Sequence, residues 1–356
     1  MITIADIRER LTEIRSPNFS QDIVALGAVR AVLFEQGIVT IQLLPPAMPQ
    51  ASLNVTINDI RRAIGAFEGV REVRVHVDRP GAQPAQDSGP VPLPGIRDIV
   101  AVSSTKGGVG KSTIATNLAV ACAKLGLRVG LMDADVYGPS LPTMLGLSGR
   151  PSVGDDKRIA PLEKHGLRLM SIGFFLDDNS PVIWRGPLVM GLVRQFLKDV
   201  DWGELDLLLI DMPPGTGDAQ LTLVQQVPLT GAVIVTTPQD VATLDVERGV
   251  AMFRHVNIPV LGVVENMSVF QCPSCGQQQD IFGHGGAERI SQNFGVPVLA
   301  RLPLAEPVRA GGDRGMPIVA AEPDHPISQQ LIAVARELIA ATAREHELSA
   351  PPTIIG

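Results

Sequence analysis

The chain has 356 residues, of which 45% are hydrophobic and 19% are charged, and its formal net charge is −7. This composition supplies enough apolar residues for a folded core and excludes an intrinsically disordered chain, while the length suggests about two domains. The acidic balance does not favour nucleic acid as a main partner, so we expect no DNA binding.

The amino-terminal residues are not expected to form a signal peptide. Met1 to Arg8 alternates apolar with polar or charged residues and lacks the basic start and the continuous apolar run of a signal peptide. No stretch approaches the roughly 20 apolar residues that a membrane-spanning helix needs, so no membrane association is expected. Three cysteines are too few for a disulfide framework. These features predict a cytoplasmic protein.

Residues 1–80 have the pattern of a small α+β domain. Apolar residues recur at helical spacing from Ile4 to Ile14 and from Ile57 to Phe67, whereas 26–44 and 70–77 have patterns typical of strands. The predicted order is α-β-β-α-β. Residues 81–95 are rich in proline and glycine without periodicity, which is typical of a semi-extended linker between domains.

From Arg97 onward, short apolar runs alternate with helical patterns. Several runs are continuously apolar, as in strands that are covered on both faces. The alternation predicts an α/β domain with a doubly wound, mostly parallel sheet over residues 96–346, a last helix from Pro326 to Glu345 and a flexible tail at 347–356. The predicted strands are Ile99–Ser103, Arg128–Met132, Leu167–Ile172, Leu205–Ile210, Ala232–Thr236, Val260–Glu265 and Val296–Arg301.

The first of these strands leads into the segment S-S-T-K-G-G-V-G-K-S-T, and a helical pattern follows it. Glycines in such a loop let backbone N–H groups approach phosphate oxygens, and the helix amino terminus adds partial positive charge. Lys111 is expected to reach the β- and γ-phosphates of a nucleotide, and Ser112 to ligate Mg²⁺. A plain glycine-rich turn is the alternative. The predicted nucleotide contacts in the loop are Gly107, Gly108, Val109, Gly110, Lys111, Ser112 and Thr113.

Aspartates follow two of the predicted strands, where the carboxyl ends of a parallel sheet gather ligands. Asp133 and Asp135 end one strand, and an aspartate there can position the attacking water or support the metal shell; two turn aspartates that cap a helix are the alternative. Asp211 ends a buried strand and precedes P-P-G-T-G-D. We expect Asp211 to bind Mg²⁺ through water and Gly215 to present its N–H to the γ-phosphate.

A C-P-x-C-G segment contains Cys272 and Cys275, whose thiolates can grip one metal ion. A structural zinc or a [4Fe–4S] cluster usually takes four ligands, and the chain has no second C-x-x-C. Cys122 is expected to pack in the core. We therefore expect two chains to contribute two thiolates each to a site that bridges a dimer. His284 is either an extra ligand or an ordinary loop histidine, and half of a zinc knuckle or a redox dithiol are alternatives for the pair.

The loop departs from G-x-x-x-x-G-K-[ST], because Thr105 stands at the usual first glycine and Lys106 follows it. At these residues the sequence resembles the deviant Walker A family, which includes MinD, ParA and the nitrogenase iron protein. The resemblance implies an ATP-sandwich homodimer in which Lys106 contacts the partner subunit's nucleotide. It also implies that Asp135 positions the attacking water, whereas Asp133 supports the metal shell. It further implies that Asn266 contacts the adenine, for which an ordinary turn asparagine is the alternative.

Six motifs together resemble the Mrp/ApbC iron–sulfur cluster carrier ATPases over about residues 96–345. They are K-G-G-V-G-K-S, D-A-D-V-Y-G-P-S, W-R-G-P at Trp184–Pro187, D-M-P-P-G-T-G-D, E-N-M-S and C-P-x-C-G, in this order. The amino-terminal unit resembles the iron–sulfur assembly domain that is often fused to these proteins. It has Ser16-Pro17-Asn18-Phe19 and Ala25-Leu26-Gly27 where that family usually shows D-P-E-L and D-L-G, which favours a role in binding partners.

The resemblance implies an ATP-hydrolysing carrier that holds a labile [4Fe–4S] cluster at a dimer interface and exchanges it with assembly scaffolds and apo iron–sulfur acceptor proteins. One alternative is a regulatory switch like MinD or ParA. The carboxyl-terminal helix has mixed charge rather than the basic amphipathic face that binds lipid, and a switch does not need Cys272 and Cys275. The other alternative is the same ATPase with a structural zinc at the cysteine pair.

Overall fold

The computed structural model describes residues 3–15, 21–35, 37–44, 50–77, 93–155, 157–176 and 186–349. Several features of the sequence lie outside these ranges: most of the expected linker, Ser16–Phe19, Trp184 and Arg185 of W-R-G-P, and the tail beyond Ser349. The chain divides into two compact units, Met1–Ser88 and Gly89–Gly356. Each unit is described by itself.

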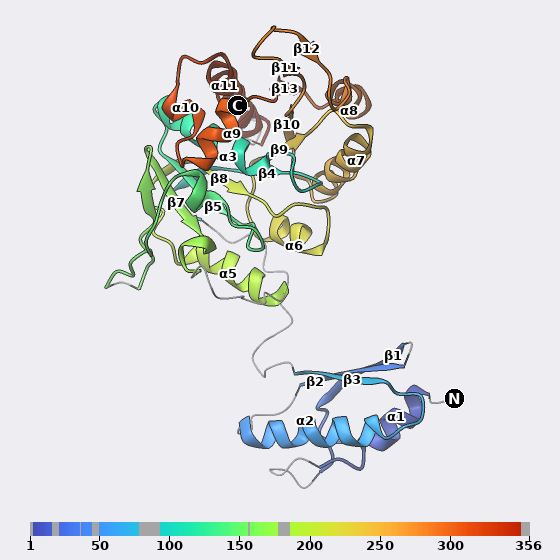
Figure 1. Cartoon of the computed structure of the whole chain (residues 1–356). Coiled ribbons are helices and arrows are strands. Elements are labelled where there is room, and N and C mark those ends of the chain that lie inside the picture. Colours follow the sequence, from blue (N-terminus) through green and yellow to red (C-terminus); the bar gives the residue numbers. More distant parts are fainter. Residues whose placement is uncertain are drawn as a thin grey trace, which may run out of the picture. The chain divides into compact units, whose positions relative to one another are not determined.

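The first unit has the α-β-β-α-β order that its sequence predicts. Two helices lie on one side of a three-stranded sheet (Figure 1), in which β2 pairs antiparallel with β1 and parallel with β3. Apolar residues of the helices, such as Ile7 and Ile60, are fully buried against Ile41 of the sheet. The elements are α1 (Ile4–Leu11), β1 (Val29–Glu35), β2 (Ile38–Leu43), α2 (Gln50–Gly65) and β3 (Glu72–Val77).

The second unit is built on an eight-stranded sheet with the order β13-β10-β9-β4-β8-β5-β7-β6. All neighbouring strands pair in parallel except β6 and β7. The strands are β4 (Ile96–Ser103), β5 (Val129–Asp133), β6 (Leu162–Lys164), β7 (Leu167–Ser171), β8 (Leu205–Asp211), β9 (Gly231–Thr236), β10 (Val260–Glu265) and β13 (Val298–Arg301). This arrangement confirms the predicted α/β, doubly wound, mostly parallel fold.

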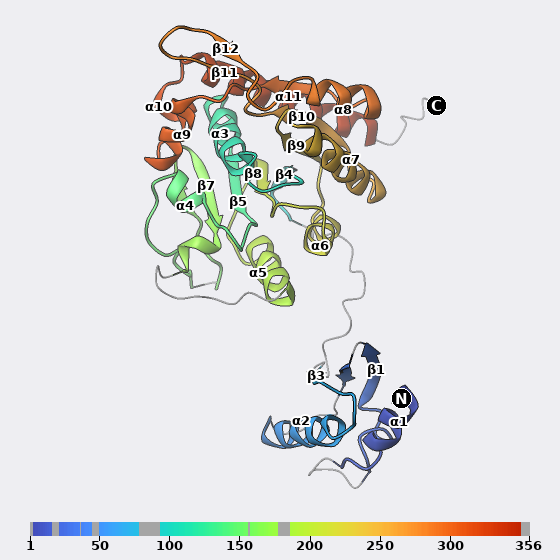
Figure 2. The same cartoon turned by 45° about the vertical axis from the view of Figure 1, so that its right-hand side comes forward.

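Helices cover both faces of this sheet (Figures 1 and 2). Because both faces are covered, a strand such as β8 buries Leu207 and Leu209 in one core and Leu208 and Ile210 in the other, which explains its continuous apolar run. One face carries α3 (Lys111–Lys124), α4 (Leu141–Met144), α9 (Glu306–Asp313), α10 (Ile318–Ala321) and α11 (Pro326–Ser349). The other carries α5 (Gly186–Lys198), α6 (Asp218–Gln226), α7 (Asp240–His255) and α8 (Gly286–Phe294).

Some short elements were not expected from the sequence. The strand β6 has three residues, η1 (Ile172–Phe174) is a single turn, and β11 (Phe270–Gln271) and β12 (Gln278–Gln279) form a two-residue ladder. The helix α11 continues to Ser349, four residues beyond the predicted Glu345. Among the described residues, no helix combines the length and apolar character needed to cross a membrane.

Candidate nucleotide site and cysteine hairpin

The candidate phosphate loop connects β4 to α3 at the carboxyl edge of the sheet. Gly107 and Gly108 are exposed, and Gly110 adopts a left-handed conformation with φ of 87° immediately before the helix. Among the residues that the structure describes, no side chain caps the helix amino terminus. Its first N–H groups therefore remain available to an anion, and the helix dipole favours negative charge at that position.

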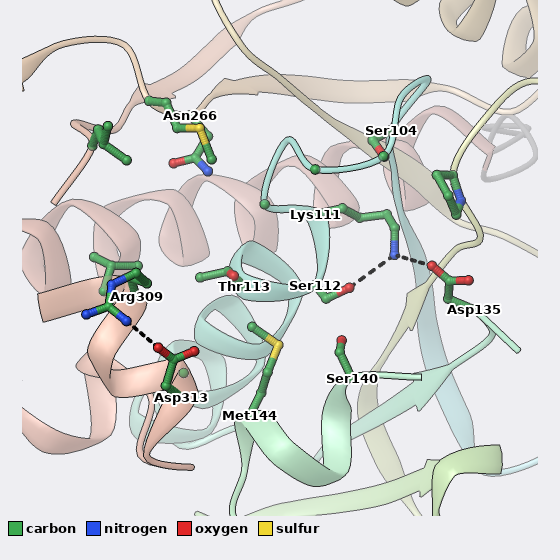
Figure 3. A pocket seen from close by; sticks show the side chains of 18 of the residues that line it. Ser104, Lys111, Ser112, Thr113, Asp135, Ser140, Met144, Asn266, Arg309 and Asp313 are labelled. Atoms are coloured by element: carbon green, nitrogen blue, oxygen red, sulfur yellow. Dashed lines mark hydrogen bonds and ion pairs between the residues drawn. The ribbon is translucent and has the colours of Figure 1, made fainter. Parts of the chain in front are cut away.

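The side chain of Lys111 is buried, with 6% of it exposed, among three oxygen groups of the site. Figure 3 shows two of them, on Ser112 and Asp135. Its Nζ lies 2.6 Å from Oδ1 of Asp211 and 3.7 Å from Oδ2 of Asp135. It also donates to Oγ of Ser112 at 3.2 Å. The four residues come from the loop, from the end of β8 and from the segment after β5, so the fold brings together the lysine, hydroxyl and carboxylates that the sequence singled out.

The two fully buried aspartates of the site differ in how their oxygens are used. Asp133 accepts from the backbone N–H of Asp135 at 3.0 Å and from the hydroxyl of Ser171 at 2.9 Å. Asp211 is bound only through Oδ1, and its buried Oδ2 has no hydrogen-bond partner among the described residues. The unused oxygen makes Asp211 the better candidate for Mg²⁺, and Asp133 instead orders the turn after β5.

The donor set fits Mg²⁺, which prefers carboxylate and hydroxyl oxygens and keeps several waters. The unpartnered Oδ2 of Asp211 needs such a group or a water to offset its burial. The Oγ of Ser140 is also buried without a hydrogen-bond partner among the described residues. It lies in a cavity that Lys111 and Ser112 also line, and it points toward Ser112 in Figure 3. Sequence reasoning assigned no role to Ser140, although it ends the D-A-D-V-Y-G-P-S motif.

Burial changes the protonation of the carboxylates. Burial and then the neighbouring Asp211 carboxylate raise the pKa of Asp133 to about 7, although Lys111 and Ser171 oppose the change. Burial also raises the pKa of Asp135, against the opposing effect of Lys111. A carboxylate with a raised pKa accepts a proton more readily than an ordinary carboxylate, which is compatible with the water-positioning role expected for Asp135.

Two residues for which the sequence predicts contacts with nucleotide are bound to other groups of the same chain. The Nζ of Lys106 lies 3.2 Å from Oδ2 of Asp245 on α7, an acid of the same chain. The N–H of Gly215 donates to the carbonyl of Ser104 at 2.9 Å, so it would have to exchange this bond to reach a γ-phosphate. Both residues are therefore bound within the chain, at contacts that a nucleotide or a partner subunit can replace.

A cavity of about 690 Å³ opens beside the loop. Its walls come from the loop, from the turns after β5 and β10, and from residues 303–313 after β13. Asn266 lines the cavity and donates through Nδ2 to the carbonyl of Val109 at 2.9 Å (Figure 3). Arg309 on α9 also lines it and pairs with Asp313 on the same helix. Sequence reasoning missed this second wall, because 303–313 contains no nucleotide motif.

Cys272 and Cys275 lie on the hairpin formed by β11 and β12. The N–H of Cys272 donates to the carbonyl of Gln277 at 2.9 Å, and the N–H of Gly276 donates to the carbonyl of Cys272 at 2.8 Å. Backbone N–H groups of Cys275 and then Ser274 directed at the sulfur of Cys272 lower its pKa. Both thiols are accessible, whereas Cys122 is buried and burial raises the pKa of its thiol to about 12.

Within the part of the chain that the structure describes, this cysteine pair has no third metal-binding side chain beside it. The described residues contain no group of three or more histidine, cysteine, aspartate or glutamate side chains able to hold a metal ion. His284 pairs with Asp280 at 3.7 Å and has 87% of its side chain exposed. It therefore does not complete a site with Cys272 and Cys275 in this structure.

Family models match both units of the chain. The model described as NUBPL iron-transfer P-loop NTPase matches residues 95–339, and the model described as iron–sulfur cluster assembly protein matches residues 4–77. Among solved structures, a nucleotide-binding protein of Archaeoglobus fulgidus in complex with ADP is 42% identical, with a TM-score of 0.56 over 63% of this chain and 88% of its own. The septum site-determining protein MinD of Pyrococcus horikoshii, at 20% identity and a TM-score of 0.53, shares the fold over 70% of this chain and 98% of its own.

Similar curated proteins are named for iron–sulfur cluster transport. The iron–sulfur cluster carrier protein of Synechocystis sp. is 44% identical over 95% of this chain and 97% of its own length. The carrier protein of Pseudomonas fragi is 51% identical over 76% of this chain and 94% of its own. The mouse iron–sulfur cluster transfer protein NUBPL is 46% identical over 70% of this chain and 78% of its own. The chain therefore belongs to the family of NUBPL-type iron-transfer P-loop NTPases, the iron–sulfur cluster carrier proteins.

Proposed function

We propose that the protein is an ATP-hydrolysing carrier whose homodimer holds a labile [4Fe–4S] cluster between the cysteine hairpins of two chains. The cluster is its cargo, taken from assembly scaffolds and passed to apo iron–sulfur proteins in the cytoplasm. The observation that carries the proposal is the pair of accessible thiols of Cys272 and Cys275, without a third metal-binding side chain beside them among the described residues.

The ligand count supports the dimer. A [4Fe–4S] cluster takes four thiolates in most proteins, and one chain offers two, so two hairpins complete the set. The lowered pKa of Cys272 favours the thiolate, which is the form that binds iron. A cluster held across an interface is released when the two chains separate, which suits a carrier better than a permanent electron-transfer site.

The nucleotide site supports the hydrolytic part. We assign Lys111 to the β- and γ-phosphates and Asp135 to the attacking water, because the two lie side by side at the carboxyl edge of the sheet. Ser112 and Asp211 would hold Mg²⁺, which would neutralise charge on the phosphates. Lys106 would leave Asp245 to contact the partner subunit's nucleotide, and Gly215 would leave Ser104 to meet the γ-phosphate. ATP binding would thereby favour the closed dimer.

A structural zinc at the cysteine pair is the competing function, since zinc also accepts four thiolates. Anaerobic reconstitution with iron and sulfide distinguishes the two. We expect a broad absorbance near about 400 nm from the cluster, which the double variant Cys272→Ser/Cys275→Ser should lose. The matched control is Cys122→Ser, which removes the buried thiol and should keep the absorbance. Zinc bound tightly at one ion per dimer, with no iron taken up, would overturn the proposal.

Coupling of ATP to transfer is tested separately with Lys111→Ala. Delivery of the cluster to an apo-acceptor should lose its dependence on ATP in this variant, because the lysine that pairs with the phosphates is gone. Loading of the cluster should remain, since Lys111 lies outside the cysteine hairpin. Unchanged ATP-dependent delivery by the variant would show that hydrolysis at this site is not coupled to transfer.

A further inference from the structure

The cysteine hairpin belongs to an excursion, residues 266–287, that leaves the end of β10 and returns at the start of α8. The excursion begins inside the nucleotide cavity, because Asn266 and Met267 both line it. Met267 has a φ of 56°, a left-handed conformation that is costly for a side chain of this size and persists only where the surroundings enforce it. Five residues further along the chain lies Cys272.

The outgoing part of the excursion pairs with the segment that follows β13. The N–H of Ser268 donates to the carbonyl of Leu302 at 2.9 Å, and the Ser268 hydroxyl donates to the same oxygen at 3.0 Å. The N–H of Leu304 then donates to the carbonyl of Val269 at 2.8 Å, and Phe270 and Leu304 form an isolated parallel bridge. We call the paired segments 266–271 and 302–305 the connector.

Both halves of the connector meet the nucleotide cavity. Asn266 and Met267 line it from one half, and 303–305 line it from the other. Asn266 is also hydrogen-bonded to the phosphate loop at Val109. A nucleotide that fills the cavity must therefore contact, or displace, the segments whose hydrogen bonds hold the hairpin.

The returning end of the excursion is fixed to the same strand. Glu265, the last residue of β10, is buried and accepts from the N–H of Ala287 in the first turn of α8 at 2.8 Å. A side chain on Gly286 would approach Oε2 of this glutamate and the carbonyl of Pro238, so the helix start packs tightly there. Because the end of the excursion at α8 is held at Glu265, a shift of the connector would move the hairpin relative to β10 and α8.

We propose that the connector couples the two sites of this chain, so that occupancy of the nucleotide cavity changes the exposure of Cys272 and Cys275 without a partner subunit, and that Ser268 is the positioning residue of this link. Ser268 does not line the cavity, yet its side chain reinforces the first hydrogen bond between the two halves. The inference rests on the proposed role of the cysteines as cluster ligands and deepens it by naming the route by which ATP regulates them.

The test uses the full-length, cluster-free protein and measures the rate at which iodoacetamide alkylates Cys272 and Cys275, by peptide mass spectrometry. Saturation with ADP or a non-hydrolysable ATP analogue should change the rate at least about fivefold, the low end of measured couplings between sites. Ser268→Ala should reduce that change to less than half while nucleotide affinity stays within about twofold. Ser268→Thr, which keeps the hydroxyl, should restore it, and Ser148→Ala on an exposed loop is the matched control.

At protein concentrations below the onset of ATP-dependent dimerisation, as located by sedimentation velocity, the rate ratio should be the same across a tenfold range of concentration. A ratio that grows with concentration would assign the effect to burial between subunits and overturn the proposal, as would a full response in Ser268→Ala. Hydrogen exchange of the Leu304 amide in the wild-type protein tests the proposal without any variant. Nucleotide binding should change the exchange rate of this amide, and an unchanged rate would refute coupling through the connector. Because no cluster is present, failure of this test and failure of reconstitution are distinct results.

Discussion

Gly110 is the loop position at which the geometry makes the sharpest prediction. A Cβ added there would lie 2.3 Å from Nδ2 of Asn266, and its φ of 87° is left-handed. For Gly110→Ala, the backbone conformation costs about 1–2 kcal/mol. The amide of Asn266 must also move away from the carbonyl of Val109, and the loss of that hydrogen bond costs about 1 kcal/mol more. We therefore expect a total loss of about 2–3 kcal/mol in the free energy of unfolding of the second unit.

The matched control is Gly126→Ala, where φ is 94° and no atom of the described residues lies within 4 Å of the added Cβ. It carries the same backbone cost and the same change in the unfolded chain, so the difference between the two variants isolates the clash with Asn266. Urea unfolding followed by tryptophan fluorescence suits the measurement, because Trp184 and Trp202 both belong to the unit Gly89–Gly356. Equal unfolding free energies for the two variants would refute the packing of Asn266 on the loop.

The remaining predictions concern three buried or paired charges. The pKa of Asp133 is raised from 3.8 to about 7, so the stability given by its protonated form is complete below pH 3.8 and is lost as pH rises to about 7. The stability of Asp133→Asn relative to wild type should therefore increase across that window and level off above it, as measured by urea unfolding at a series of pH values. Asp245→Asn releases Lys106 in both chains of the dimer. Since a surface ion pair is worth about 0.2–1 kcal/mol, the two pairs together should let ATP-dependent dimerisation occur at up to about thirtyfold lower concentration in sedimentation velocity. His346→Ala removes the 2.6 Å contact from α11 to the buried Asp98 and should cost about 1 kcal/mol in unfolding free energy; no loss would show that the contact does not secure the helix end.

The sequence predicted the fold well in segments whose apolar residues follow a regular pattern along the chain. The runs that end at Asp133 and Asp211 are apolar on both faces, and this pattern alone identifies covered parallel strands. Parallel strands place their carboxyl ends at one edge, so the proximity of Lys111 to Asp135 and Asp211 followed from the order of the elements. The short strands β6, β11 and β12 were missed, because two or three residues carry too little periodicity to be recognised.

Contacts between residues that are distant in the sequence could not be predicted from it. Nothing in the sequence pairs Lys106 with Asp245 on α7, or Ser171 with Asp133, since these contacts depend on the packing of whole elements. The metal-shell role expected for Asp133 stays a prediction. Its oxygens accept from protein donors, and among the described residues the buried carboxylate oxygen of the site without a partner belongs to Asp211. The N–H of Gly215 likewise donates to the backbone carbonyl of Ser104, a contact that no sequence motif indicates.

The central claim is that two chains share one cluster through Cys272 and Cys275. Native mass spectrometry of the anaerobically reconstituted protein tests it most directly, because it gives the mass of each assembly and its bound metal together. We predict a [4Fe–4S] cluster on the dimer alone, one for every two chains, with bare chains as the monomer species. A cluster carried by monomers, or dimers that hold zinc in place of iron, would contradict the account.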